Sequence, residues 1–336
     1  MGPRLLITGA SGFVGGRAAA AATARAGIAH VRLLTRTEQP PRPRRSPESP
    51  HPSAPVVENV LGDLRDPASL RRACEGVDVL VHCAAAIGAD EETARQVNDE
   101  GTRSLVDAAV RAGVTRIVAL STASVHGRGT FRAAAPGTLP IAPGSTTSRT
   151  RAAGERHVLD AGGTVLRPHL VYGTGDRQLV PGLVRLLTAL PGPFANGGGA
   201  VGSVHSVIDV ESLAGALLGA ALSPRTEPGA YYVGHPEPVP AAALIAAAET
   251  LTVRPPEAPG TPVADVAAAC NLLADLPFAQ HHLAMLATDH WFADDRPWRE
   301  LGCVPGPGFA EGFAAHAPWY RRLLLGAARS GPTPTS

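Results

Sequence analysis

Three glycines near the N-terminus are the first residues whose type and spacing could do chemistry. Gly9, Gly12 and Gly15 recur at intervals of three, after the apolar run 5–8 and before the Ala-rich stretch 17–26. In a strand–turn–helix unit, the first glycine permits a tight turn, the second lets the backbone approach a pyrophosphate, and the third lets the helix pack on the strand. Backbone N–H groups at the helix N-terminus then face the anion. The motif predicts a dinucleotide site, and the alternative is a glycine-rich turn that binds nothing. The residues expected at this site are Gly9, Ser11, Gly12, Phe13, Val14 and Gly15.

The composition argues against several classes of protein. The chain has 336 residues, 44% of them hydrophobic, and a formal net charge of +1 from 30 basic and 29 acidic residues. Nucleic-acid binders carry a basic stripe, which this sequence lacks, so we expect no nucleic-acid partner. The sequence also has no run of about 18 apolar residues and no charged leader before an apolar run. We therefore expect no membrane span, no signal peptide and a cytoplasmic protein.

The cysteines and basic residues narrow the chemistry further. Cys74, Cys83, Cys270 and Cys303 lie far apart, without the paired spacing of a zinc site, so we expect reduced, mostly buried thiols and no metal. Apart from histidines, every basic residue is an arginine. A mechanism that needs a lysine amine is therefore excluded.

Apolar runs alternate with helix-like segments through the first half of the chain. The runs cover residues 5–8, 31–34, 56–60, 79–83, 117–120 and 165–166. This alternation predicts an α/β fold, a Rossmann-type doubly wound parallel sheet with its ligand at the carboxyl edge. We assign residues 1–173 to this dinucleotide-binding domain.

After about residue 174 the pattern changes to helices punctuated by proline and glycine. The expected helices cover residues 179–190, 211–222 and 240–250. They predict a smaller, mostly helical substrate-binding cap over residues 174–329, with some return to the core, and a frayed tail at 330–336. Between the second and third runs, residues 38–55 are rich in proline and arginine, which predicts a mobile surface loop near the cofactor. A tolerated surface insertion is the alternative there.

Further strings stand in the order found in extended short-chain dehydrogenases/reductases, and the chain resembles this family over roughly residues 4–325. The family includes nucleotide-sugar epimerases and dehydratases. The strings are Gly62-Asp63-Leu64, His82-Cys83-Ala84-Ala85-Ala86, Val97-Asn98-Asp99-Glu100-Gly101-Thr102, Arg167-Pro168-His169-Leu170-Val171-Tyr172-Gly173 and Val204-His205-Ser206-Val207-Ile208-Asp209-Val210.

The resemblance implies roles for residues in these strings. Asp63, with Leu64 beside it, would contact the adenine; the alternative is a strand-end carboxylate that caps the next turn. Small residues after the fourth run would form a wall along the cofactor, where bulk would obstruct the dinucleotide. The remaining cofactor contacts that the resemblance implies are Ala84, Ala85, Ala86, Ser121, Arg151, Pro168 and Leu170.

The chain departs from the family at the proton-transfer site. There the family has a Ser or Thr, and a Tyr followed four residues later by a Lys. Thr122 matches the first hydroxyl, but Thr147 stands at the Tyr position and Arg151 at the Lys position. The tyrosines are at 172, 231, 232 and 320, and none lies four residues before an arginine. The resemblance implies a catalytic set of Thr122, Thr147, Arg151 and Asn98, and substrate contacts from Ser124, His126 and His169.

This loss restricts the reaction. A tyrosine titrates near 10, and a neighbouring ammonium lowers its pKa toward working pH, whereas a threonine hydroxyl has no such acidity. Arg151 could hold a ribose hydroxyl but does not deprotonate. His126 and His169 have a suitable intrinsic pKa, although structural packing is the alternative for both.

Reduction of a ketone is the reaction that tolerates this site best. It needs only a proton for the emerging alkoxide, which water or a phenol beside the ketone could supply, whereas oxidation of an alcohol needs a base. The sequence resembles the atypical extended reductases of angucyclinone antibiotic pathways, which implies an aromatic polyketide ketone as substrate. The alternatives are a catalytically inactive cofactor-binding sensor and a nucleotide-sugar epimerase or ketoreductase.

The end of the second apolar run indicates which cofactor is preferred. Thr35-Arg36-Thr37 stands where an acidic residue would bind the ribose hydroxyls of NAD. Arg36 could pair with a 2′-phosphate, so we expect NADPH to be preferred over NADH. A solvated strand-end charge is the alternative. We expect a small aromatic ketone as the partner, and a monomer or homodimer.

Overall fold

The computed structural model describes residues 2–37, 54–194, 201–252 and 261–329. The expected loop at 38–55 lies outside the described residues except for its last two positions, and the expected tail at 330–336 lies wholly outside them.

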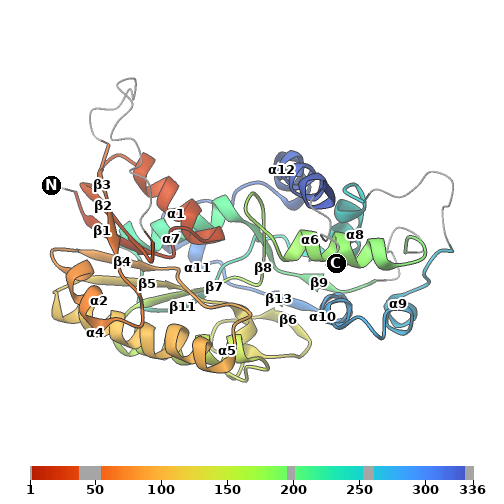
Figure 1. The fold of residues 1–336 in the computed structure, drawn as a ribbon, viewed down its shortest axis with the longest axis horizontal. Helices are drawn as coiled ribbons and strands as arrows, with labels where there is room; N and C mark the ends of the chain where they lie inside the picture. Colours follow the sequence, from red (N-terminus) through yellow and green to blue (C-terminus); the bar gives the residue numbers. More distant parts are fainter. Residues whose placement is uncertain (1, 38–53, 195–200, 253–260, 330–336) are drawn as a thin grey trace, which may run out of the picture.

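A seven-stranded parallel sheet forms the larger half of the molecule (Figure 1), which confirms the predicted fold class. Its strand order is β11-β7-β5-β4-β1-β2-β3. The six predicted strands are present, and the seventh, β11, was not predicted. β1 lies between β2 and β4, so the strand order reverses there and a crevice opens at the carboxyl ends. The strands are β1 (Arg4–Thr8), β2 (His30–Thr35), β3 (Val56–Leu61), β4 (Val79–His82), β5 (Arg116–Leu120), β7 (Thr164–Arg167) and β11 (Gly229–Tyr232).

Helices cover both faces of this sheet (Figure 1). Along β1, Leu5 and Ile7 pack toward α1 and α7, while Leu6 packs into the core on the opposite face; all three are fully buried. Burial on both faces explains why the strands are apolar runs rather than alternating patterns. The helices are α1 (Phe13–Ala24) and α7 (Val210–Leu222) on one face, and α2 (Pro67–Cys74), α4 (Thr102–Arg111) and α5 (Thr146–Asp160) on the other.

Helix α7 corrects one expectation. We expected residues 211–222 in the cap, but α7 packs against α1 and the main sheet. Its small buried residues, with Gly219 against the backbone of Leu301, allow this close approach. The chain therefore returns to the Rossmann half earlier than its helical pattern indicated.

The smaller half lies at one end of the molecule and is built from helices and two small sheets (Figure 1). One sheet pairs β8 (Leu170–Tyr172) with β10 (Val207–Asp209), and the other has the order β12-β9-β13-β6. The predicted helices at 179–190 and 240–250 correspond to α6 and α8. The strands of the second sheet are β6 (Phe131–Ala134), β9 (Val204–His205), β12 (Val239–Pro240) and β13 (His290–Phe292). The helices are α6 (Leu179–Ala189), α8 (Ala241–Glu249), α9 (Val266–Leu272), α10 (Pro277–Leu286) and α12 (Phe309–Arg329), and the short α11 (Arg296–Glu300) follows β13.

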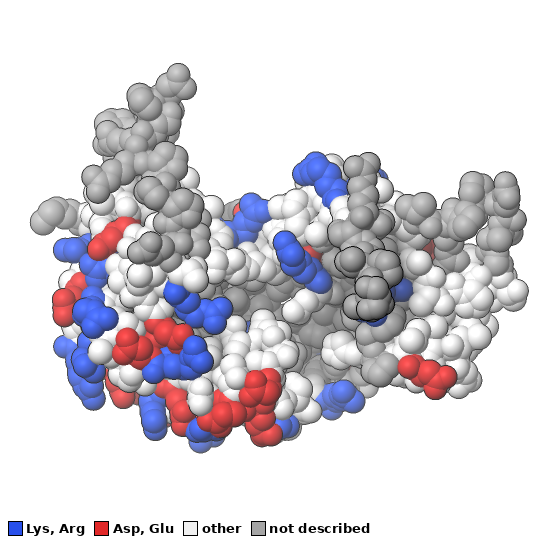
Figure 2. Space-filling view, viewed as in Figure 1, with Lys and Arg blue, Asp and Glu red and all other residues white. Residues whose placement is uncertain are grey.

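The surface carries charges of both signs. On the face shown in Figure 2, blue and red side chains are interspersed over the Rossmann half, and few are visible over the smaller half. Among the described helices, none combines the length and the apolar character that a membrane crossing requires.

Candidate active site

The glycine turn at the end of β1 is packed so tightly that larger residues would not fit. Gly9 has a φ of +71°, and a Cβ there would lie 2.6 Å from the amide nitrogen of Ala84. A Cβ on Gly15 would lie 2.3 Å from the carbonyl oxygen of Gly9. Helix α1 therefore rests directly on the turn, and the turn rests on the loop after β4.

The N-terminus of α1 is open to an anion. Gly12 is its N-cap, and no side chain among the described residues caps the first turn. The N–H groups of Phe13 and Val14 thus begin the helix without a side-chain acceptor, next to the exposed Ser11. This geometry fits the pyrophosphate of a dinucleotide.

Two buried hydroxyls at the carboxyl ends of strands support the same fit. Thr35 Oγ1, at the end of β2, and Ser121 Oγ, directly after β5, are buried and lack a hydrogen-bond partner in the part of the chain that the structure describes. Buried polar atoms usually have partners. A dinucleotide lying across the carboxyl edge would supply them.

At the expected adenosine end, Asp63 is held by a neighbouring arginine. Its carboxylate accepts hydrogen bonds from the guanidinium and the backbone N–H of Arg65. Hydrogen bonding by Arg65 lowers the pKa of Asp63 to about 2, and the charge of Arg36 adds to the effect. Leu64 is buried beside it. Arg36 and Asp63 are therefore electrostatic neighbours at the ends of adjacent strands.

A buried histidine that the sequence did not single out fixes the wall of the crevice. His82 lies between Thr8 Oγ1, 2.7 Å from its Nδ1, and Thr102 Oγ1, 3.0 Å from its Nε2. Thr8 Oγ1 also accepts a hydrogen bond from the N–H of Ala84. Burial lowers the pKa of His82 to about 4, so the ring is neutral at pH 7. These hydrogen bonds position the loop that begins at Ala84, the first residue of the expected small-residue wall.

Asn98 acts on the same loop from the π-helical segment η1 (Arg95–Gly101). Its side-chain oxygen accepts the N–H of Ala86 at 2.7 Å, and its amide donates to the carbonyl of Ala86 at 2.9 Å. The amide also donates to Thr150 Oγ1 on α5 at 3.0 Å. Asn98 therefore links the wall, which includes Ala85, to the helix that carries the proton-transfer positions.

Those proton-transfer positions hold hydroxyls and a guanidinium. Thr122 Oγ1 accepts the N–H of Ser124, and Thr147 Oγ1 accepts the N–H of Gly88. Arg151, one turn after Thr147 on α5, donates to the carbonyl of Leu120 at 2.6 Å. Burial lowers the pKa of Arg151 from its ordinary value, but a guanidinium stays charged.

None of the four tyrosines takes the place of the family's catalytic tyrosine, whose position Thr147 occupies. Tyr172 and Tyr320 lie in the core of the smaller half, and Tyr231 hydrogen-bonds Glu300. Tyr232 hydrogen-bonds His126. None of them lies on α5, where the family's tyrosine would be.

His126 is placed in the interior rather than on an open surface. Its Nδ1 is 2.8 Å from the carbonyl of Pro140, and its Nε2 is 2.7 Å from the hydroxyl of Tyr232. Next to it, Arg167 and Glu155 form a buried ion pair with hydrogen bonds of 3.1 and 3.2 Å. Both ring nitrogens are thus occupied, which favours the packing interpretation, while its substrate contact stays a prediction.

A cavity of about 300 Å³ borders His169. The carbonyl of Pro168 accepts the N–H of Ala123, which ties this segment to the loop carrying Ser121 and Thr122. Leu170 follows as the start of β8, and Ser124 is exposed. The aromatic residues that line the cavity are Tyr232, Trp291, Phe292 and Trp298. Three of them come from a segment in which the sequence showed no motif.

Known proteins share both the sequence pattern and the fold. The 3-beta hydroxysteroid dehydrogenase/isomerase family matches residues 6–238. The 2-alkyl-3-oxoalkanoate reductase of Stenotrophomonas maltophilia (strain K279a) is 30% identical over 288 residues, which cover 76% of this chain and 84% of that reductase. The 3beta-hydroxysteroid-dehydrogenase/decarboxylase isoform 2 of Arabidopsis thaliana is 31% identical over 206 residues, which cover 54% of this chain and 36% of that protein.

Two solved structures illustrate the shared fold. Bordetella bronchiseptica WbmH, in complex with NAD+, aligns with a TM-score of 0.71 at 20% identity, over 96% of this chain and 99% of WbmH. DesIV, the dTDP-glucose 4,6-dehydratase of Streptomyces venezuelae, with NAD and TYD bound, aligns with a TM-score of 0.68 at 24% identity, over 95% and 97%. Since the family match spans well over half of the sequence, this chain belongs to the 3-beta hydroxysteroid dehydrogenase/isomerase family, within the extended short-chain dehydrogenases/reductases, and is an oxidoreductase.

Proposed function

We propose that the protein is an NADPH-dependent ketoreductase whose substrate is an aromatic ketone with a hydroxyl beside the carbonyl. The angucyclinone polyketides have this arrangement, and the C-7 carbonyl of a simocyclinone-type precursor in antibiotic biosynthesis is the specific candidate. The observation that carries the proposal is the site on α5, where Thr147 and Arg151 stand in place of a phenol and an ammonium.

The direction of the reaction follows from those side chains. When bound, the nicotinamide supplies the hydride that reduces the carbonyl carbon. Thr122 and Thr147 offer hydroxyls for hydrogen bonds but no acidic proton, and the guanidinium of Arg151 keeps its protons. Reduction needs a proton from elsewhere, and the phenol of the substrate lies within reach of the new alkoxide. Oxidation would need a base that these three residues do not provide.

Arg151 has two contributions in this scheme. Its bond to the carbonyl of Leu120 fixes the guanidinium at the carboxyl end of β5, where it would donate to the ribose hydroxyls of a bound nicotinamide cofactor. Its buried charge also stabilises a developing alkoxide electrostatically. Both contributions need a charged donor, and neither needs a proton to be released.

The cavity next to His169 supports an aromatic substrate. Indole, phenol and phenyl groups line it, and flat rings stack on such surfaces in offset or edge-to-face geometry. Its volume of about 300 Å³ is at the lower end of the range for small-molecule sites. Part of a polycyclic substrate would therefore extend beyond this cavity.

A second candidate is reduction of a 3-oxo acid, because the relative from Stenotrophomonas maltophilia is named as a 2-alkyl-3-oxoalkanoate reductase. Nucleotide-sugar epimerisation or dehydration begins by oxidising an alcohol, and the hydroxyl site argues against it. A catalytically inactive sensor would have no need of the polar set Asn98, Thr122 and Arg151.

The test is reduction of an ortho-hydroxyaryl ketone, followed by loss of NADPH absorbance, beside its O-methyl ether and a 2-alkyl-3-oxoalkanoate. We expect turnover with the free phenol and nearly none with the ether, while NADPH binding is unchanged. Thr147→Val should cost much less than the 10²- to 10⁴-fold that loss of a general acid causes. Thr146→Val is the matched control, since Thr146 Oγ1 accepts a hydrogen bond from the exposed Arg149.

The opposite pattern would overturn the proposal. If the ether is reduced normally while Thr147→Val or His126→Ala loses about a thousandfold, a protein side chain is the acid. If only the 3-oxo acid is reduced, the second candidate holds. Binding of NADPH without reduction of any ketone would favour the sensor.

A further inference from the structure

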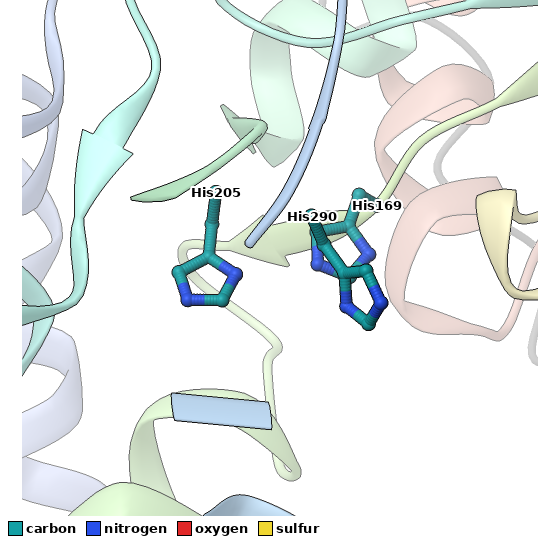
Figure 3. Close-up of side chains that lie close together, drawn as sticks. All are labelled: His169, His205 and His290. Atoms are coloured by element: carbon teal, nitrogen blue, oxygen red, sulfur yellow. The ribbon is translucent and has the colours of Figure 1, made fainter. Parts of the chain in front are cut away.

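Three histidines that are far apart in the sequence meet between the two halves of the molecule. His169 follows β7, His205 ends β9, and His290 begins β13. Each offers a ring nitrogen, and these nitrogens all lie within 4.8 Å of one another. Figure 3 shows the three rings turned toward a common region, with His169 and His290 close together and His205 to one side.

Each of these rings has a buried nitrogen that the protein leaves unpaired. His169 Nε2, His205 Nδ1 and His290 Nε2 lack a hydrogen-bond partner among the residues that the structure describes. Native proteins satisfy nearly all buried polar atoms. Three rings that meet at one place, each with an unsatisfied nitrogen, therefore indicate a shared partner.

A hydrogen bond to the other nitrogen of the His205 ring leaves a lone pair on its unpaired nitrogen. Ser203 Oγ donates its hydrogen to the carbonyl of Leu286, so it can only accept from His205 Nε2 at 3.1 Å. His205 therefore carries its proton on Nε2 and keeps a lone pair on the unpaired Nδ1. The unpaired Nε2 of His290 is a further free position, and the His205 ring has its other nitrogen fixed by the Ser203 hydroxyl. Metal-binding histidines have this arrangement, with the second nitrogen held by a carbonyl or hydroxyl.

We propose that His169, His205 and His290 form a binding site for a divalent transition-metal ion, with Zn²⁺ as the first candidate. Imidazole nitrogens bind Zn²⁺ at about 2.0–2.1 Å, so binding would draw the three rings together. His169 also lines the cavity of about 300 Å³, and the fourth position would therefore open toward it. The proposal does not depend on the ketoreductase activity.

The surroundings supply the outer groups that such a site needs. Asp289 precedes His290, and its carboxylate accepts the N–H of Val204 at 2.8 Å and a hydrogen bond from Arg132. Its charge acts on both His205 and His290. The ring of Phe131 stacks on the ring of His290, with 5.1 Å between the ring centroids, and covers one face of that imidazole. Three neutral ligands leave the ion's charge largely uncompensated, so we expect an anionic oxygen, hydroxide or a ligand group, at the fourth position.

The spacing of the cysteines had predicted no metal. That expectation weighed only Cys pairs, whereas this cluster comes from three segments that contain one histidine each. The cluster forms because β9 and β13 pair at His205 and His290, and no local sequence motif predicts this pairing.

The test uses untagged, chelator-treated protein, titrated with Zn²⁺ by calorimetry and with Co²⁺ by visible absorption. We expect one equivalent of Zn²⁺ and the absorption of tetrahedral Co²⁺. His290→Gln and His205→Gln should each weaken Zn²⁺ binding at least tenfold and remove the Co²⁺ band. His30→Gln is the matched control, because His30 lies at the start of β2 and contacts Glu58. Circular dichroism and NADPH binding check that each variant folds.

Two results would overturn the site. One is wild-type protein that binds no stoichiometric Zn²⁺, or that gives no tetrahedral Co²⁺ spectrum. The other is a folded His290→Gln variant that binds as tightly as wild type. His290 is only partly buried, so this variant and the wild-type spectrum decide the question even if His205→Gln fails to fold.

Discussion

The cofactor edge and the junction between the two halves are stabilised in opposite ways. At the cofactor edge, the turn from Gly9 to Gly15 packs closely because its glycines have no side chains and neighbouring backbone atoms fill that space. At the junction, the buried Arg167–Glu155 pair and the His126–Tyr232 hydrogen bond work because polar side chains meet. A substitution in the turn should destabilise the protein by adding atoms. A substitution at the junction should destabilise it by removing the partner of a buried polar group.

This difference also determines what each region can do. The turn from Gly9 to Gly15, called the cradle below, offers fixed backbone dipoles, which suit a cofactor that is the same in every turnover. The junction offers polar groups beside an aromatic cavity, the features expected of a small-molecule site. Substitutions in the two regions should therefore act in different ways.

The largest effect should come from breaking the buried ion pair. Glu155→Ala leaves the guanidinium of Arg167 buried without its partner, and we expect a loss of about 3–5 kcal/mol in the free energy of unfolding. Urea denaturation measures it. The double variant Glu155→Met/Arg167→Met, which removes both charges, should recover most of the loss. A cost below about 1 kcal/mol would mean that the pair behaves like an exposed one.

A methyl group in the cradle should cost nearly as much. Gly9→Ala combines a positive φ, worth roughly 1–2 kcal/mol, with contact to the backbone of Ala84, worth roughly 1–3 kcal/mol. Gly27→Ala is the control, since Gly27 also has a positive φ but no atom within 4 Å of the added Cβ. We expect Gly27→Ala to show only the smaller cost and to keep NADPH binding. Equal losses in the two variants would refute the close packing of the turn.

Acidification should destabilise the wall of the cofactor crevice through His82. Its pKa is lowered from 6.5 to about 4 by burial, so the unfolded chain binds more protons than the folded one. The stabilisation is complete above about pH 6.5 and is lost as the pH falls toward 4, by an amount on the order of 2–3 kcal/mol. His82→Gln should flatten this part of the curve of unfolding free energy against pH. Parallel curves for variant and wild type would show that His82 does not carry the effect.

The two regions also differ in how far the sequence could predict them. The glycine spacing and the apolar runs are local patterns, so six of the main strands and the position of the cradle followed from them. The seventh strand, Gly229–Tyr232, was not predicted because it is short and pairs with β7, which is far away in the sequence. Helix α7 was expected in the cap because a helical pattern does not state which surface it will cover.

The junction was predicted least well because it depends on pairings between distant segments. The strands that build it have two to four residues, too few for a periodic pattern. His82 looked like part of a strand, and only its neighbours Thr8 and Thr102 reveal its role. The departure at Thr147 and Arg151 was visible because a family pattern existed to compare it with.

The smallest effect concerns the choice of cofactor at the edge of the cradle. Arg36 is exposed at the end of β2 and acts electrostatically on Asp63, so its charge is available to a 2′-phosphate there. Arg36→Ala should weaken NADPH binding about tenfold, roughly 1.4 kcal/mol, and leave NADH binding nearly unchanged. Fluorescence titration with both cofactors measures the two constants. Arg25→Ala is the matched control, because Arg25 is also exposed but caps the C-terminal end of α1, away from the glycine turn. If Arg36→Ala weakens both cofactors equally, the guanidinium attracts the dinucleotide in general and does not read the 2′-phosphate.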